Sequence, residues 1–233
     1  MKLVIFDIDG TLIHSHPQEV ACFEMAILSV LGIANIDHNI HGYQHVTDSG
    51  ILKECVYRAL KRFPTMTEMA DIEAEYLAKF SNIIKDDPIQ PIAGVQPFIE
   101  TLQSMPNVAL AVATGSHHRS ALLKLSHVNQ ALCEVPMGTS TDSEVRTTIM
   151  EIALNNAKKT YGINDFNQII YIGDGPWDVK AVKNLQWGFI GVASNYAKSQ
   201  LQEWGAKCVI GDYLAQTDFL HFMQSEQMHK ITN

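Results

Sequence analysis

KLVIFDIDGTL, residues 2–12, is the stretch that decides the fold of this chain. After Lys2, residues 3–6 form a continuous apolar run, which is typical of a strand buried on both faces of a parallel sheet. Asp7 and Asp9 come next, and they point the same way because side chains alternate along an extended segment. Gly10 then permits a tight turn away from the sheet. The stretch predicts a buried strand that carries two carboxylates at its carboxyl end.

Two carboxylates placed as close together as Asp7 and Asp9 need a partner. Like charges at such a distance raise the pKa of one group or require a cation. A hard cation with oxygen ligands, most simply Mg²⁺, meets that requirement. The alternative interpretation is a pair of solvated loop acids without a ligand.

Short apolar segments alternate with helical ones from Gly94 onward. The segments expected to form strands are residues 107–114, 168–174, 188–193 and 206–211. The segments expected to form helices are residues 95–105, 118–126, 144–161 and 177–185. Such alternation predicts a parallel sheet with helices on both faces, to which the first strand also belongs. We therefore expect the α/β class, with a doubly wound parallel sheet.

Residues 14–91 differ from the rest of the chain because they are rich in helix formers. Helices are expected over residues 19–32, 51–62 and 66–85. In the first of them, apolar residues recur at helical spacing and form one stripe: Val20, Phe23, Ile27, Val30 and Leu31. The pattern predicts an inserted helical domain, here called the cap, over residues 14–91. The core domain would then comprise residues 1–13 and 92–233.

Thr114, Gly115 and Ser116 follow the second expected strand. Ligands of such sheets bind at the carboxyl ends of the strands. A hydroxyl group together with free N–H groups at a helix N-terminus suits an anion such as phosphate. The alternative is that Thr or Ser simply caps the helix.

Asp174 and Asp178 follow the strand expected at residues 168–174. Pro176 suits the first position of the next helix, where its missing N–H is not needed. Asp178 would lie one turn into that helix, so both carboxylates can face the strand ends. Acids also stabilise helix N-termini without any ligand, which is the alternative. Two acidic loops on neighbouring strands favour a site.

Arg146 is the basic residue expected to balance these carboxylates around a phosphate. It precedes the long helix that ends near Tyr161. An arginine keeps its charge and makes planar, bidentate contacts with phosphate or carboxylate. The alternative is a solvated arginine in the first turn of the helix.

These elements, in this order, resemble the haloacid dehalogenase superfamily over most of the chain. DIDGTL is similar to its nucleophile motif, AVATGS to its second motif and IGDGPWD to its fourth. The helical insertion is placed like the α-helical cap of the phosphoglycolate phosphatase-like members. The third motif is Lys in many members, and Arg146 within DSEVR looks like its substitute. Lys158 and Lys159 would lie at the far end of the long helix.

The resemblance implies a phosphatase that hydrolyses a phosphate monoester through an aspartyl-phosphate. Asp7 would attack phosphorus, and Asp9 would act as the acid and then the base. Thr114 and Arg146 would be catalytic, because they would bind the transferring phosphoryl group. Gly115 and Ser116 would complete the substrate contacts.

The resemblance also implies a Mg²⁺ site. Asp7 and Asp174 would hold the ion together with Asp9, the last through its backbone carbonyl. Asp178 would orient a metal-bound water or Arg146 from outside this set.

Residues 42–48, GYQHVTD, resemble the cap segment that faces the substrate in related phosphatases. Thr47 is therefore expected to contact the substrate. The alternative is that Thr47 or Asp48 caps the next helix. In either case the cap should select the substrate, because the core binds only the phosphoryl group.

Other activities use similar motifs. A dehalogenase needs neither the second aspartate nor a metal, and Asp9 and Asp174 argue against it. A phosphonoacetaldehyde hydrolase would need a cap lysine such as Lys53, but it resembles DxAGT at the first motif. A sugar phosphomutase shares the motifs and stays open. A non-catalytic receiver domain, with its own acidic cluster, is much shorter and has no cap.

Composition limits the partners of the chain. The 233 residues carry a net charge of −8 and a pI near 5.6, which excludes a broad basic surface for nucleic acid or an anionic membrane. No apolar run reaches the roughly 20 residues of a membrane helix, and no signal peptide is evident. Four scattered cysteines fit reduced thiols in the cytoplasm. We expect a cytoplasmic monomer or weak homodimer that acts on a small phosphorylated metabolite.

Overall fold

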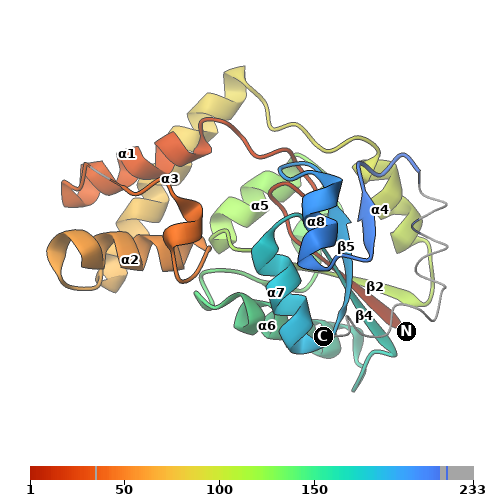
Figure 1. Cartoon of the computed structure of the whole chain (residues 1–233). Coiled ribbons are helices and arrows are strands. Elements are labelled where there is room, and N and C mark those ends of the chain that lie inside the picture. The colour runs from red at the N-terminus through yellow and green to blue at the C-terminus, as the bar shows by residue number, and fades with distance from the viewer. Residues whose placement is uncertain (35, 216–218, 220–233) are drawn as a thin grey trace.

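The computed structural model describes residues 1–34, 36–215 and 219, and its centre is one parallel sheet (Figure 1). The strands are β1 (Lys2–Phe6), β2 (Val108–Ala113), β3 (Met137–Gly138), β4 (Gln168–Gly173), β5 (Gly188–Val192) and β6 (Cys208–Ile210). Their order across the sheet is β3-β2-β1-β4-β5-β6, and every pairing is parallel. The predicted doubly wound α/β sheet is confirmed.

The register places the site residues at one edge of the sheet. Phe6, the last residue of β1, lies opposite Val112 of β2 and Ile172 of β4. Asp7, Thr114 and Asp174 therefore follow their strands at nearly the same height along the sheet, with an offset of at most one residue. The carboxyl ends of three adjacent strands meet there, as expected for a ligand site in such a sheet.

Helices cover both faces of the sheet because successive strand residues point to opposite sides. On the face of Val4 and Phe6 lie α4 (Val95–Gln103) and α5 (His118–Ser126). On the face of Leu3 and Ile5 lie α6 (Arg146–Tyr161), α7 (Pro176–Leu185) and α8 (Lys198–Trp204). The helices predicted at residues 95–105, 118–126, 144–161 and 177–185 correspond to α4 to α7.

The sequence pattern missed β3 and α8. β3 is two residues long and α8 is seven, so neither has the length over which an apolar period can be recognised. β3 is recognisable only from its pairing with β2, in which Val112 lies opposite Met137.

Three helices form a group beside the sheet, as Figure 1 shows. They are α1 (Glu19–Leu31), α2 (Asp48–Leu60) and α3 (Met66–Asp86). Thr65 and Glu68 form a reciprocal capping box that fixes the start of α3. The chain enters and leaves this group through adjacent segments, because the His14 N–H donates to the Gln90 carbonyl at 2.9 Å. The division into a core and a cap at residues 14 and 91 stays a prediction.

The apolar stripe predicted on α1 is wrong at its first position. Val20 is 59% exposed, and the buried residues of the helix are Cys22, Ala26 and Ile27. The buried face is rotated because α1 packs on α3 at one side and borders a cavity at the other. Among the described helices, none combines the length and apolarity needed to cross a bilayer.

Candidate active site

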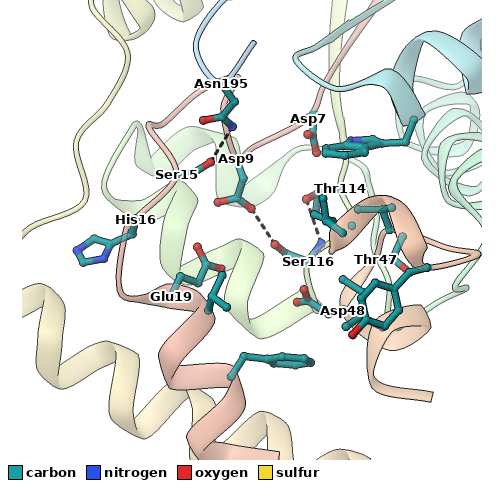
Figure 2. A pocket seen from close by; sticks show the side chains of 18 of the residues that line it. Asp7, Asp9, Ser15, His16, Glu19, Thr47, Asp48, Thr114, Ser116 and Asn195 are labelled. Carbon is teal, nitrogen blue, oxygen red and sulfur yellow. Dashed lines mark hydrogen bonds between the residues drawn. The ribbon is translucent and has the colours of Figure 1, made fainter. Parts of the chain in front are cut away.

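A cavity of about 600 Å³ opens at the carboxyl ends of β1, β2 and β4 (Figure 2). Core residues Asp7, Asp9 and Thr114 lie at its base, and residues of α1 and of the segment before α2 form the opposite wall. Of the predicted site residues, only Asp178 does not line it. The structure thus brings together residues up to 167 positions apart in sequence, from Asp7 to Asp174.

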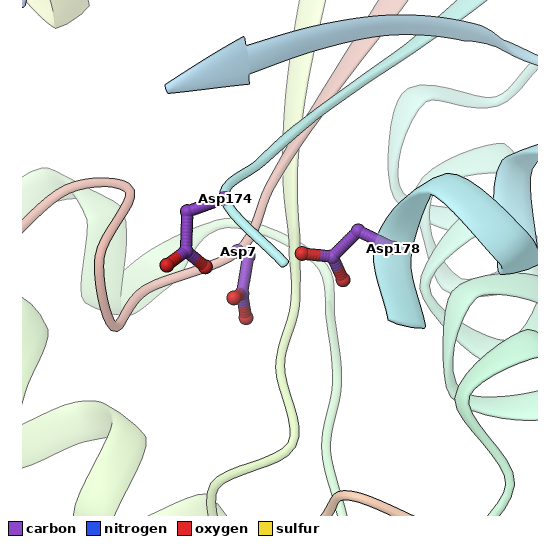
Figure 3. A group of neighbouring side chains, drawn as sticks. All are labelled: Asp7, Asp174 and Asp178. Carbon is purple, nitrogen blue, oxygen red and sulfur yellow. The ribbon is translucent and has the colours of Figure 1, made fainter. Parts of the chain in front are cut away.

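Three buried carboxylates form a cluster at the base of the cavity (Figure 3). One oxygen each of Asp7, Asp174 and Asp178 lies within 4.8 Å of the others. Asn195 Nδ2 donates to Asp174 Oδ2 at 2.8 Å, and the Gly175 N–H donates to Asp178 Oδ2 at 3.1 Å. Asp178 thereby caps the N-terminus of α7, which was the alternative to a ligand site. It is also a member of the acidic cluster.

The cluster is unfavourable for three negative charges. Burial raises the pKa of Asp7 to about 7, and Asp178 and Asp9 add to the rise while Arg146 opposes it. Burial also raises the pKa of Asp174 well above its usual value, and it raises that of Asp178. An all-oxygen set of this kind fits a hard divalent cation such as Mg²⁺, whose charge would favour the ionised carboxylates.

Gly10 is required where the chain turns away from β1. Its φ is +72°, and a Cβ there would lie 2.2 Å from Asp174 Oδ2. The turn predicted from the sequence is thus present, and it brings the residues after β1 against the loop after β4.

The side chain of Asp9 is not part of the acidic cluster. Ser116 Oγ donates to Asp9 Oδ2 at 3.0 Å, and Lys124 Nζ donates to the same oxygen at 2.7 Å. Asp9 Oδ1 is buried and has no hydrogen-bond partner. One oxygen is therefore fixed by the protein and the other is available for a proton. The expected metal contact through the Asp9 backbone carbonyl stays a prediction.

Lys124 is a site residue that the sequence analysis missed. Its side chain is 1% exposed and pairs with Asp9 and with Glu19 at the start of α1. Burial lowers the pKa of Lys124, but Asp9 and Glu19 outweigh it and raise the pKa well above its usual value. A usable signal was present, because Lys124 lies on the same face of α5 as the apolar Ala121 and Leu125.

Replacing Lys124 with Met is expected to lower the free energy of unfolding by about 2–3 kcal/mol. A buried ion pair that loses one partner usually costs about 3–5 kcal/mol. The loss is smaller here because the side chains of Asp9 and Glu19 keep 28% and 20% of their area exposed. Urea unfolding measures the difference. Lys53→Met is the control, since Lys53 pairs with Glu144 at the surface and should cost about 1 kcal/mol or less. Equal losses in both variants would contradict the assignment.

Arg146, expected just before the long helix, is the first residue of α6. Its Nη1 donates to Asp7 Oδ1 at 3.4 Å, and its Nε lies 3.7 Å from Asp178 Oδ1. Nη2 donates to the Val46 carbonyl at 3.2 Å. The alternative of a solvated arginine is wrong, because the side chain is largely buried between the acidic cluster and the segment before α2. Lys158 pairs with Asp165 in the last turn of the same helix, at the other end.

The loop after β2 is built around close contacts. A Cβ on Gly115 would lie 2.9 Å from Arg146 Nη2, so a larger residue there would displace the guanidinium. The Ser116 N–H donates to Thr114 Oγ1 at 3.2 Å. Neither hydroxyl caps α5, because its N-cap is His117, which makes no side-chain cap. The Ser116 hydroxyl and N–H already donate to Asp9 and Thr114, and an anion contact by Thr114, Gly115 and Ser116 stays a prediction.

Thr47 closes the other side of the cavity. Its hydroxyl donates to the Glu144 carbonyl at 3.0 Å and accepts from the Gly50 N–H at 3.2 Å. It is thus the N-cap of α2, which was the alternative to substrate binding. The adjacent Asp48 accepts from the His117 N–H at 2.9 Å. A contact of Thr47 with substrate stays a prediction.

The raised pKa of Asp7 predicts how pH changes the stability of the metal-free protein. The folded state holds a proton up to about pH 7, whereas an unfolded Asp releases it near its usual value of 3.8. The contribution of Asp7 to the free energy of unfolding is therefore fully present below pH 3.8 and is lost as the pH rises through about 7.

Mg²⁺ should reverse this loss, because it competes with protons for the cluster. We expect millimolar MgCl₂ to raise the Tm more at about pH 7.5 than at about pH 5. Thermal unfolding with KCl at matched ionic strength is the control. A Tm increase that is equal at both pH values would contradict a metal site in this cluster.

Comparisons with known proteins show the family of this chain and agree with its fold. The family model of haloacid dehalogenase-like hydrolases matches residues 1–186. A hydrolase from Pseudomonas syringae aligns with a TM-score of 0.72 at 21% identity, covering 97% of this chain and 100% of that chain. A protein described as a predicted phosphoglycolate phosphatase from Haemophilus somnus aligns with a TM-score of 0.65 at 16% identity, covering 96% and 98%. CbbY from Rhodobacter sphaeroides, in complex with phosphate, aligns with a TM-score of 0.67 at 17% identity, covering 91% and 95%. Comparison with curated proteins gave no match.

Proposed function

Because this chain belongs to the haloacid dehalogenase-like hydrolases, we propose that it hydrolyses phosphate monoesters of small metabolites through a phosphorylated Asp7. The observation that carries the proposal is the setting of Asp7 and Asp9. Asp7 lies beside Arg146, and Asp9 has one oxygen fixed by Ser116 and Lys124 and the other unpartnered. A nucleophile next to a proton donor is the arrangement that two-step phosphoryl transfer needs.

In the first step a carboxylate oxygen of Asp7 attacks phosphorus, and the bond between phosphorus and the ester oxygen breaks. Asp9 gives its proton to that oxygen, so the product leaves as a neutral alcohol. In the second step Asp9, now a carboxylate, takes a proton from water, and the water oxygen attacks phosphorus. The bond between phosphorus and Asp7 breaks, and inorganic phosphate leaves.

The remaining residues act on charge and position. The Arg146 guanidinium, already within hydrogen-bond distance of Asp7, would bind the oxygens of the transferring group. The Thr114 hydroxyl and the backbone of Gly115 and Ser116 would bind the same oxygens from the other side. Mg²⁺, held by Asp7 and Asp174 with Asp178 close by, would offset the repulsion between anionic nucleophile and anionic substrate.

Hydrolysis of halides is disfavoured by the same residues. Displacement of a halide needs a carboxylate nucleophile, but it produces no alkoxide for Asp9 to protonate. It also has no use for the acidic cluster of Asp174 and Asp178. A Schiff-base reaction at Lys53 is disfavoured as well, because this lysine pairs with Glu144 and does not line the cavity.

Phosphate release from a panel of phosphorylated metabolites tests the proposal. We expect release with Mg²⁺, loss of release with EDTA and recovery when Mg²⁺ is restored. Release that persists unchanged in EDTA would contradict the role of the acidic cluster. No release from any monoester in the panel, by protein that unfolds cooperatively, would contradict the proposed reaction.

A further inference from the structure

The wall of the cavity that faces away from Asp7 is apolar. It is formed by side chains of α1, of the segment before α2 and of α2: Val20, Phe23, Ile40, Tyr43 and Ile51. Val20 and Ile40 are 59% and 36% exposed, so part of this apolar wall is open to a ligand. Apolar surface left open inside a cavity is typical of a ligand site.

The charges around this wall are acidic. Among the described residues that line the cavity, Arg146 is the only Lys or Arg, and it lies at the Asp7 end. Glu24, Asp37 and Asp48 lie on the cap side, and Asp37 forms an ion pair with Arg58 at 3.0 Å. Of the two lining histidines, His16 contacts the Asp87 carbonyl at 3.0 Å and His38 lies 3.2 Å from Glu24. Both histidine rings are thus held by contacts within the protein.

From this distribution we propose that the preferred substrate is a monoester of an alcohol with an apolar, ring-sized body and no second anionic group. The inference rests on the proposed phosphatase function and adds the substrate class. An apolar body would cover Val20 and Phe23, whereas a carboxylate or a second phosphate there would meet Glu24 and Asp48 without a countercharge. A bisphosphate, which a phosphomutase must hold in one of its states, has such a second group.

A matched pair of esters tests the inference. In 4-methylbenzyl phosphate and 4-carboxybenzyl phosphate the methylene group insulates the leaving oxygen from the ring substituent. The two therefore differ mainly in the charge that reaches the apolar wall. We expect kcat/KM to be at least about tenfold higher for 4-methylbenzyl phosphate. The carboxylate of the other compound would lie beside acidic side chains without a countercharge, and such a contact costs at least the equivalent of that factor.

A charge-reversing variant makes the test specific to the wall. Val20→Lys places a cation on the cavity side of α1, and it should raise kcat/KM for 4-carboxybenzyl phosphate by about tenfold. Leu28→Lys is the matched control, since Leu28 is exposed on the same helix but does not line the cavity. It should leave the ratio between the two esters unchanged.

The outcomes separate the two proposals. The substrate class is wrong if the wild-type protein hydrolyses 4-carboxybenzyl phosphate as fast as 4-methylbenzyl phosphate. It is also wrong if Val20→Lys does not change the ratio of their kcat/KM values. In both cases the phosphatase function stands. If neither benzyl ester nor any metabolite of the wider panel releases phosphate, the phosphatase function fails and the substrate class fails with it.

Discussion

Asp7→Asn is expected to abolish phosphate release while leaving the fold intact. The amide of asparagine has nearly the shape of the carboxylate, but it is too weak a nucleophile to attack phosphorus. Loss of a nucleophile that acts together with its neighbours lowers kcat by factors on the order of 10⁴–10⁶. Stability should not fall, because burial already raises the pKa of Asp7 to about 7 and a neutral group suits the metal-free site. Phosphate release and the Tm, measured on the same preparation, give both results.

Asp165→Asn is the matched control for this substitution. Asp165 has a largely exposed side chain and pairs with Lys158 at the end of α6, away from the cavity. Its replacement should leave kcat/KM unchanged. Turnover in Asp7→Asn above about one hundredth of the wild-type rate would exclude Asp7 as the nucleophile, since no member of such a unit is that dispensable.

Arg146→Ala is expected to lower kcat/KM by a factor on the order of 10²–10³. Removing a charge from a buried network costs about 3–5 kcal/mol, and a loss at the lower end of that range from the transition state gives this factor. The substitution leaves Asp7 and Asp178 without the guanidinium that contacts them. The Tm should change little, because both carboxyl groups have raised pKa values and can bind protons instead.

Arg146→Lys and Lys158→Ala complete this experiment. A lysine keeps the positive charge, but its ammonium group cannot contact Asp7 and Asp178 together as the planar guanidinium does. Arg146→Lys should therefore recover part of the rate that Arg146→Ala loses. Lys158 lies on the same helix and pairs with Asp165, so its loss should leave the rate near normal. Near-normal turnover in Arg146→Ala together with an inactive Lys158→Ala would show that the third-motif charge lies elsewhere.

The sequence alone determined the sheet and the residues at its strand ends. β1, β2, β4 and β5 were recognisable because buried parallel strands are continuous apolar runs. Once these strands are parallel and adjacent, Asp7, Thr114 and Asp174 must meet at one edge, since each leaves its strand at the same level. Arg146 was expected beside these carboxylates because their charge needs a cation, although β3, the strand before its helix, was not recognised.

Only the tertiary structure decided the contacts made across the cavity. The helical spacing of α5 places Lys124 on the buried face, but its partner Glu19 lies 105 positions away in sequence, so only the fold shows that the two pair. Asn195 reaches Asp174 from the loop after β5, and Val20 lies on the cavity because of how α1 packs on α3. Periodicity and propensity describe neighbours within a few residues. The charge and shape of the substrate wall arise from side chains that are distant in sequence, and folding alone brings them together.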